Sequence, residues 1–252
     1  MAQKKLERFE AIKSFPNVLQ YPEGMAGRWH AFFGNQHALT LELACGKGEY
    51  TVGLARMYPE RNFVGVDIKG NRIYAGAKKC LDEKISNAGF LRTQIDKINS
   101  YFAGGEVSEI WLTFPDPQLR TSKAKKRLTH PLFLRLYQQI LVPGGSIHLK
   151  TDSPILYTFT MKVVQMYGLL LHRHSDNLYG GIVDLDRELE IRTYYESLDI
   201  AKSKTVYYIC FSLPDHSLPS LDAALQEQIK ESEKTGRDMD YAADADSSNP
   251  KR

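Results

Sequence analysis

An acidic residue held between two prolines, Asp116, is the part of this sequence that most strongly suggests chemistry. It follows the apolar run 110–114, and the prolines at 115 and 117 restrict the backbone on both sides of it. A basic stretch comes next, with Arg120, Lys123, Lys125, Lys126 and Arg127. These residues also fit an ordinary turn followed by a solvated basic stretch. The alternative is a site at which a polyanion meets a fixed carboxylate.

A second candidate site is the Gly-x-Gly turn at 46–48, which follows another apolar run. Glycines allow the backbone to turn tightly and to approach a ligand closely. A dinucleotide fingerprint would need a third glycine where Thr51 stands, and the turn also lacks the Lys-Ser/Thr ending of a P-loop. Asp67, after the next run, could accept hydrogen bonds from both ribose hydroxyls of an adenosine, and Asp96 could face the adenine edge. A tight turn without a ligand is the simpler alternative.

The elements that must position these residues alternate regularly along the chain. Strand-like runs are expected at 39–44, 62–67, 88–93, 107–113, 146–151, 169–171 and 206–211. Helical segments are expected at 50–57, 71–84, 131–140 and 154–166. This alternation indicates βαβ units, and therefore an α/β fold with a doubly wound, mainly parallel sheet. Because parallel strands end at one edge of such a sheet, the candidate residues should meet there.

Outside the expected domain at 39–212, the composition changes. Residues 1–38 are rich in basic and aromatic side chains and are expected to form an arm with one or two short helices. Residues 213–235 should form a helical extension, with an amphipathic helix over about 218–234. Residues 236–252 contain too few apolar side chains to offset the entropy of ordering, so we expect them to be disordered.

The overall composition is typical of a soluble globular protein: 252 residues, 42% hydrophobic and 25% charged. We expect no membrane association, because no apolar run approaches the roughly 18 residues of a spanning helix, and the N-terminus lacks the apolar core of a secretion signal. Cys45, Cys80 and Cys210 lack metal-ligand spacing and are sparse, which predicts no metal and a cytoplasmic location. A net charge of +3 means that any nucleic-acid binding must come from a local patch.

The glycine turn together with Asp67 resembles the Class I S-adenosylmethionine-dependent methyltransferases. The resemblance implies a Rossmann-like sheet of seven strands with the last one antiparallel, and S-adenosylmethionine as cofactor. In that family, the acidic residue before the glycine turn, here Glu42, lies near the methionine end of the cofactor. The residue at Asp67 binds the ribose. Ala44 stands at the first position of the usual three-glycine pattern.

A closer resemblance depends on four segments in a fixed order: Phe114-Pro115-Asp116-Pro117, the basic stretch ending at Arg127, Lys150-Thr151-Asp152, and Thr193-x-Tyr195-Glu196. Together they are similar to the bacterial tRNA (guanine-N7)-methyltransferases, which modify guanine 46 in the tRNA variable loop, and the resemblance covers about residues 39–211. It implies tRNA as substrate; a monomer or a homodimer is expected.

By position, the resemblance assigns roles to single residues. The residues expected to bind the cofactor are Glu42, Gly46, Gly48, Asp67, Asp96 and Asp116. Asp116 is also expected to lie closest to the reacting centre and to be the catalytic residue. The residues expected to contact the substrate are Arg120, Asp152, Thr193, Tyr194, Tyr195 and Glu196. The side chains expected to contact RNA phosphates are Lys123, Lys125, Lys126 and Arg127. The chain departs from the usual family pattern at four places. Gln118 stands where the family has a tryptophan, and Arg120 stands where it has a lysine. Lys123 and Ala124 occupy the region where the family has a histidine, and Leu198 stands where it has a final lysine.

The chemistry that this implies needs no strong base, because guanine N7 carries a lone pair and no hydrogen. Asp116 and Asp152 are therefore expected to orient the guanine and to stabilise positive charge. Either carboxylate could instead cap a helix, and Asp152 precedes Ser153-Pro154, a common helix start. His148 and Lys150 are expected to be structural. The alternative functions are a Class I methyltransferase acting on rRNA or a small molecule, or a non-catalytic RNA-binding relative.

Overall fold

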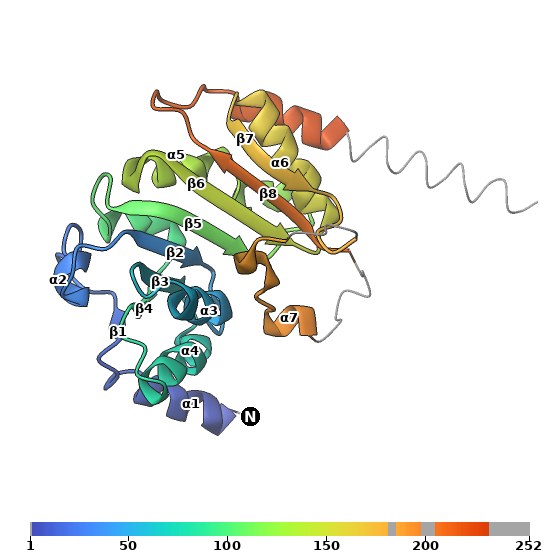
Figure 1. Ribbon diagram of the computed structural model, residues 1–252. Helices are drawn as coiled ribbons and strands as arrows, with labels where there is room; N and C mark the ends of the chain where they lie inside the picture. Colours follow the sequence, from blue (N-terminus) through green and yellow to red (C-terminus); the bar gives the residue numbers. More distant parts are fainter. Residues whose placement is uncertain (1, 181–184, 198–204, 232–252) are drawn as a thin grey trace, which may run out of the picture.

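The computed structural model describes residues 2–180, 185–197 and 205–231, and a single eight-stranded sheet forms its centre (Figure 1). The strands are β1 (Val18–Gln20), β2 (Leu39–Leu43), β3 (Asn62–Asp67), β4 (Ala88–Arg92), β5 (Val107–Thr113), β6 (Leu141–Thr151), β7 (Leu170–Ser175) and β8 (Tyr207–Ser212). Their spatial order is β1-β4-β3-β2-β5-β6-β8-β7. Only β8 runs against its neighbours, β6 and β7. The predicted α/β class, the mainly parallel sheet and the antiparallel last strand are confirmed.

The strand count is a correction, because the sheet has eight strands and the sequence predicted seven. The additional strand, β1, lies within the expected N-terminal arm and pairs in parallel with β4 at the edge of the sheet. With three residues, Val18–Gln20, it is too short to show a periodic pattern. Residues 18–20 therefore belong to the same sheet as the candidate site.

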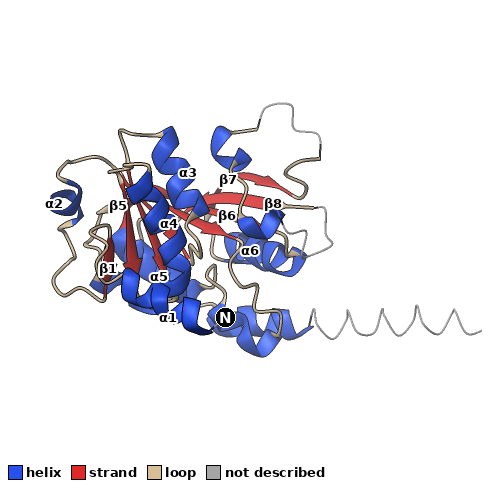
Figure 2. Ribbon diagram, turned by 90° about the horizontal axis from the view of Figure 1, so that it is seen from below, coloured by secondary structure: helices blue, strands red, loops and turns tan. Residues whose placement is uncertain are grey.

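Helices cover both faces of the sheet (Figure 2). They are α1 (Ala2–Ala11), α2 (Trp29–Phe33), α3 (Glu49–Met57), α4 (Gly70–Asp82), α5 (Pro131–Ile140), α6 (Pro154–Met166) and α7 (Tyr194–Ser197), with 3₁₀ turns η1 (Ile95–Ser100), η2 (Thr121–Lys126) and η3 (Arg187–Glu190). Apolar side chains alternate along the strands: Leu41 and Val64 join the core under α5 and α6, and Phe63 and Trp111 join the core under α3 and α4. A strand buried on both faces is typical of a doubly wound fold.

The predicted C-terminal helix occupies residues 222–231 in the described part of the chain, and its remaining predicted residues lie outside it. The tail at 236–252 also lies outside the described residues. No helix of the described residues is both long enough and apolar enough to cross a membrane.

The start of α6 decides between two interpretations of Asp152. The helix is capped by Ser153, whose hydroxyl accepts the backbone N–H of Leu156 at 3.2 Å, and Pro154 occupies the first turn. Asp152 precedes this cap and is not the capping residue. Its carboxylate therefore stays available to the carboxyl edge of the sheet.

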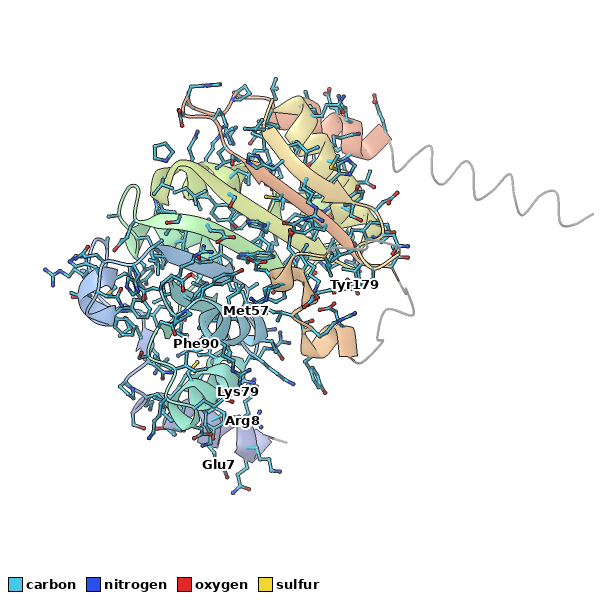
Figure 3. All side chains as sticks on the ribbon, in the orientation of Figure 1. Glu7, Arg8, Met57, Lys79, Phe90 and Tyr179 are labelled. Carbon is cyan, nitrogen blue, oxygen red and sulfur yellow. The ribbon has the colours of Figure 1, made fainter. Side chains whose placement is uncertain are left out.

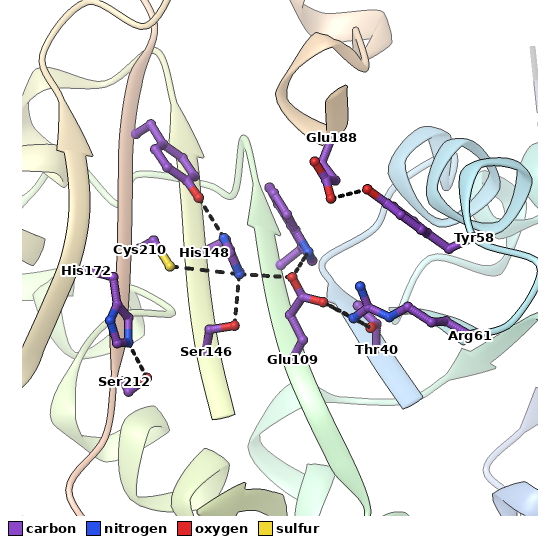
Figure 4. A network of polar contacts seen from close by, with 12 residues as sticks. Thr40, Tyr58, Arg61, Glu109, Ser146, His148, His172, Glu188, Cys210 and Ser212 are labelled. Carbon is purple, nitrogen blue, oxygen red and sulfur yellow. Dashed lines mark hydrogen bonds and ion pairs between the residues drawn. The ribbon is translucent and has the colours of Figure 1, made fainter. Parts of the chain in front are cut away.

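A buried polar network joins β5, β6 and β8 behind the site (Figure 4). His148 Nε2 lies 3.0 Å from a carboxylate oxygen of Glu109, and its Nδ1 lies 2.7 Å from the hydroxyl of Tyr208. Glu109 also pairs with Arg61, and the Trp111 ring stacks on the imidazole at 4.1 Å. Burial alone would lower the pKa of His148, but its contacts with Cys210 and Glu109 outweigh burial and raise the pKa to about 9.

This network predicts a pH-dependent contribution to stability. The folded pKa of His148 lies above its ordinary value, so the stabilisation is fully present below about pH 6.5 and is lost as the pH rises through about 9. Urea unfolding of the wild type and of His148→Gln should show a difference in unfolding free energy that shrinks by about 3 kcal/mol between pH 6.5 and 9.5. Comparing the two proteins cancels the other titrating groups. A difference that does not change with pH would contradict the assignment.

Candidate functional site

A cavity of about 480 Å³ lies at the carboxyl edge of the sheet, where β2 and β5 meet. The strand order reverses there, because β3 and β4 follow β2 on one side while β5 and β6 extend to the other. This is the position at which doubly wound folds bind ligands, and the volume suits a small molecule. The cavity gathers six predicted site residues: Glu42, Gly46, Asp67, Asp116, Asp152 and Thr193.

Five other predicted residues do not line this cavity: Gly48, Asp96, Arg120, Tyr194 and Glu196. Gly48 has a different reason to be glycine, because a Cβ there would lie 2.5 Å from a ring carbon of Phe90. Asp96 is exposed in η1, and Arg120 is exposed at the start of η2. Nothing is described for the side chain of Tyr195.

Glu42 is a buried carboxylate at the bottom of the cavity. One of its oxygens accepts the backbone N–H of Thr51 at 2.8 Å and the Thr51 hydroxyl at 2.6 Å, and the other accepts the hydroxyl of Thr113 at 2.8 Å. Burial raises the pKa of Glu42 to about 7, against the lowering effect of these hydrogen bonds. Glu42 therefore changes charge near neutral pH, and a cation in the cavity would favour its ionised form.

Asp67 holds the glycine turn against the end of β3. Its two carboxylate oxygens accept the backbone N–H groups of Gly46 at 2.9 Å and Lys69 at 2.8 Å. Each oxygen has a second lone pair, so the carboxylate can still accept hydrogen bonds from a ligand. Ala44 has a φ of 59°, a backbone conformation that favours glycine. This conformation explains why the usual three-glycine pattern has a glycine at this position.

The loop that carries Asp116 is strained at both ends. Phe114 and Gln118 have φ values of 48° and 47°, a region that bulky side chains rarely adopt. Among the hydrogen bonds that hold the loop, the Phe114 N–H donates to the Lys150 carbonyl at 2.8 Å, and the Gln118 N–H donates to Asp116 Oδ1 at 3.0 Å. The carboxylate of Asp116 remains exposed at the rim of the cavity. Strain of this kind is concentrated at functional sites.

Arg127 was predicted to contact RNA phosphates, but its side chain is buried. The residue is 2% exposed, and its guanidinium lies 4.6 Å above the ring of Phe159. Its Nε donates to the carbonyl of Pro117 and its Nη2 to that of Gln118, both at 3.1 Å. Because these contacts engage the guanidinium inside the protein, it is not available to an RNA phosphate, and the prediction for Arg127 was wrong. Its hydrogen bonds instead hold the Asp116 loop in place, so Arg127 clamps this loop. Lys123, Lys125 and Lys126, in contrast, are exposed on η2.

The Thr193–Glu196 segment forms a reciprocal helix cap at the start of α7. The Thr193 N–H donates to the Glu196 carboxylate at 2.8 Å, and the Glu196 N–H donates to the Thr193 hydroxyl at 3.3 Å. This is the Thr-x-x-Glu capping box, a signal that the sequence contains and that could have been recognised. The Glu196 carboxylate also meets Lys150 Nζ at 3.2 Å and accepts the Tyr179 hydroxyl at 2.8 Å. Glu196 is thus already engaged inside the protein.

The cavity also contains functional groups that the sequence reasoning missed. Lys47, Lys69 and Arg72 bring positive charge to a cavity otherwise rich in carboxylates, and Thr113 supplies the hydroxyl bound to Glu42. Thr113 ends β5, and Lys47, Lys69 and Arg72 lie within five residues of the ends of β2 and β3, which is the signal that could have identified them, because residues near the carboxyl ends of parallel strands line this edge. The cavity can therefore hold a ligand that carries both signs of charge.

Comparison with known proteins identifies similar chains. A family model described as "Putative methyltransferase" matches residues 36–208. The chain is 51% identical over 214 residues to a tRNA (guanine-N(7)-)-methyltransferase of Porphyromonas gingivalis, covering 80% of this chain and 86% of that protein. It is 45% identical to the protein of the same name from Bacteroides thetaiotaomicron, covering 86% of this chain and 89% of that one.

Solved structures share the fold at low identity. The 16S rRNA methyltransferase KamB has a TM-score of 0.57 at 15% identity, covering 79% of this chain and 99% of that chain. The 16S rRNA (adenine(1408)-N(1))-methyltransferase from Catenulisporales acidiphilia has a TM-score of 0.54 at 14% identity, covering 75% and 93%. At these identities the likeness extends to the fold alone.

Proposed function

The chain belongs to the tRNA (guanine-N7)-methyltransferase family, and we propose that it transfers a methyl group from S-adenosylmethionine to N7 of guanine 46 in the variable loop of tRNA. One observation supports the proposal most strongly. A single cavity unites Glu42 and Asp67, at the carboxyl ends of β2 and β3, with Asp116 and Asp152, which follow β5 and β6. A donor and an acceptor could therefore meet between these two groups.

The residues on the β2 and β3 side fit S-adenosylmethionine. Gly46 lines the cavity and has open space where a Cβ would stand, so a ligand can approach its backbone. Asp67 has free lone pairs for ribose hydroxyls. Glu42 can oppose the positive charge of the methionine end, while Lys47 can oppose its carboxylate. When bound, the cofactor supplies an electrophilic methyl group on a sulfonium.

The residues on the β5 and β6 side would position the guanine. N7 has a lone pair and no hydrogen, so its bond to the methyl carbon can form without a general base. Asp116 and Asp152 could accept hydrogen bonds from N1–H and N2–H₂ and so fix the ring with N7 in line with the methyl group. Their negative charge also stabilises the positive charge that develops on the purine. Asp116 is the catalytic residue in this proposal because it would touch the reacting base.

The exposed residues of η2 would hold the RNA. Lys123, Lys125 and Lys126, with Arg120 before them, would contact phosphates and give binding a strong salt dependence. The target base must leave its stack to enter the cavity, at a cost of a few kcal/mol. A substrate used in translation also favours a cytoplasmic location, and we propose that the enzyme acts as a monomer or a homodimer.

Base-resolved mapping of purified tRNA after incubation with labelled S-adenosylmethionine tests the function. The expected result is one N7-methylguanosine, at position 46. The matched control is the same tRNA with 7-deazaguanosine at that position, which keeps the N1 and N2 donors but lacks the N7 lone pair, and it should accept no methyl group there. Methylation at another atom, or methylation of the 7-deaza substrate at position 46, would overturn the proposal.

The raised pKa of Glu42 predicts a pH dependence of cofactor affinity. A folded pKa of about 7 leaves the carboxyl largely neutral at pH 5.5 and increasingly ionised as the pH rises. Because the ionised form attracts the cationic cofactor, the Kd for S-adenosylmethionine should fall about fivefold between pH 5.5 and 7.5. Calorimetric titration measures this, and Glu42→Gln should flatten the profile, because its oxygen can still accept from Thr51 and its NH₂ can donate to the Thr113 hydroxyl, but it cannot ionise. An equal slope in both proteins would contradict the role of Glu42.

A further inference from the structure

A second cavity, of about 560 Å³, lies between α3, α4 and the segment 187–192. Met57 on α3 and Lys79 on α4, both labelled in Figure 3, belong to its lining. We call this cavity the basic groove, because five cationic side chains line it against one carboxylate, Glu49. The cations are Lys47, Arg56, Lys79, Arg187 and Arg192. They come from three segments that are far apart in the sequence, so the fold itself gathers the charge.

Three of these cations are not neutralised by an ion pair within the described residues. Lys47, Lys79 and Arg187 have no carboxylate within salt-bridge distance there, whereas Arg56 pairs with Glu83 and Arg192 lies 3.8 Å from Glu196. Gathering several like charges that lack ion pairs around one cavity raises the electrostatic energy of the folded chain unless an anion enters it. The basic groove therefore favours a ligand with several negative charges.

The segment 187–192 is fixed in place as one wall of the basic groove. Ile191 packs on α3 at Gly53, where an added Cβ would lie 2.9 Å from the Ile191 side chain. Glu188 accepts a hydrogen bond from the hydroxyl of Tyr58, at the end of α3. The backbone of this wall is thus preformed, while four of the cations that line the groove, Arg56, Lys79, Arg187 and Arg192, are exposed to solvent.

The basic groove is continuous with the cofactor cavity. Lys47 and Glu49 line both of them, and the segment that forms the wall at 187–192 continues into Thr193, which lines the cofactor cavity. A chain of phosphates that starts at a base held near Asp116 could therefore run over Lys47 into the groove. The side chain of Lys47 is already near this path, with its ammonium 3.0 Å from the centre of the Tyr194 ring.

We propose that the basic groove binds the sugar-phosphate backbone of the tRNA next to the target guanine. This inference rests on the proposed function, because it takes the polyanion to be the RNA whose base enters the neighbouring cavity. Phosphates need charge without base-specific contacts, and the lining of lysines and arginines supplies it. The groove and the lysines of η2 would then contact the RNA on two sides of the flipped base.

The test is the salt dependence of tRNA binding by the full-length protein. The double variant Lys79→Gln/Arg187→Gln removes two cations that lack ion pairs and that do not line the cofactor cavity, and it should weaken tRNA binding about tenfold at physiological salt. The slope of log Kd against log salt should fall by about 1.5, since each lost phosphate contact contributes roughly 0.7 to 0.9. The Kd for S-adenosylmethionine, measured in parallel, verifies that the variant is folded.

Lys78→Gln is the matched control, because Lys78 neighbours Lys79 on α4 but pairs with Asp82 outside the groove. It should change the tRNA Kd less than twofold. Wild-type tRNA affinity and slope in the double variant, or an equal loss in Lys78→Gln, would overturn the groove as an RNA site. A wild type that binds tRNA through the groove but never methylates N7 would instead overturn the proposed function, so the two failures are distinguishable.

Discussion

Replacing Asp116 with alanine is expected to lower kcat/KM for tRNA methylation by about 100-fold or more, the usual cost of removing a group aimed at developing charge. Asp116 lies on the rim of the cavity, and its carboxylate makes one hydrogen bond with its own loop, from the Gln118 N–H. The residue is exposed, so the loss of stability should stay within about 1 kcal/mol. Single-turnover methylation and urea unfolding measure the two effects separately.

Asp116→Asn separates the charge from the geometry of the turn. An asparagine oxygen can still accept the Gln118 N–H, and Arg127 still clamps the carbonyls of Pro117 and Gln118. If the carboxylate acts through its charge and by accepting hydrogen bonds from guanine, Asp116→Asn should be nearly as inactive as Asp116→Ala. Activity close to the wild type in Asp116→Ala would refute a catalytic role, and recovery in Asp116→Asn alone would reduce that role to loop geometry.

The centre of the sheet was predictable because its middle strands are buried on both faces. Runs such as 63–66 and 110–112 are continuously apolar, and two of the later helices have clear starts, with Pro131 and Pro154 in the first turns of α5 and α6. The position of the site followed from the same pattern, since Asp67 and Asp116 had to lie at one edge. The edge strand β1 was not predictable, because three residues carry no periodicity.

Side-chain roles were less predictable than positions. Arg127 has the same charge as Lys125 and Lys126 and lies next to them, but it alone is buried. The turn of η2 decides which of these side chains faces inward, and a run of charges contains no such information. Gly48 shows the same limit: the sequence suggests a close approach to a ligand, while the structure places the ring of Phe90 against it.

Lys150 connects the two halves of the substrate side. Its backbone carbonyl accepts the Phe114 N–H and so holds the Asp116 loop. Its ammonium donates to the carbonyls of Leu189 at 3.1 Å and Ile191 at 2.9 Å, which belong to the wall of the basic groove or directly adjoin it. The same ammonium meets Glu196 at 3.2 Å. One buried strand residue thus positions the loop that carries Asp116 and the segment that leads into α7.

Replacing Lys150 with methionine is expected to destabilise the protein by about 3 kcal/mol or more, because the change leaves the Glu196 carboxylate buried without its partner. The exposed fraction is 0% for the Lys150 side chain and 4% for that of Glu196, so water cannot replace the lost contact without local opening. Burial already lowers the pKa of Lys150 to about 8, although Glu196 opposes this shift. Urea unfolding at pH 7 measures the loss, and tRNA affinity should fall with it, since the groove wall loses its anchor.

A second substitution distinguishes an unpaired charge from a simple loss of packing. Lys150→Met/Glu196→Gln removes both charges, while the glutamine oxygen can still accept the Thr193 N–H and the glutamine NH₂ can donate to the Tyr179 hydroxyl oxygen. If the uncompensated carboxylate causes the loss, the double variant should recover about 1 to 2 kcal/mol relative to Lys150→Met alone. Equal or lower stability of the double variant would contradict this explanation. The tRNA affinity of the double variant should remain low even then, because the carbonyls of Leu189 and Ile191 still lack the ammonium that orients them.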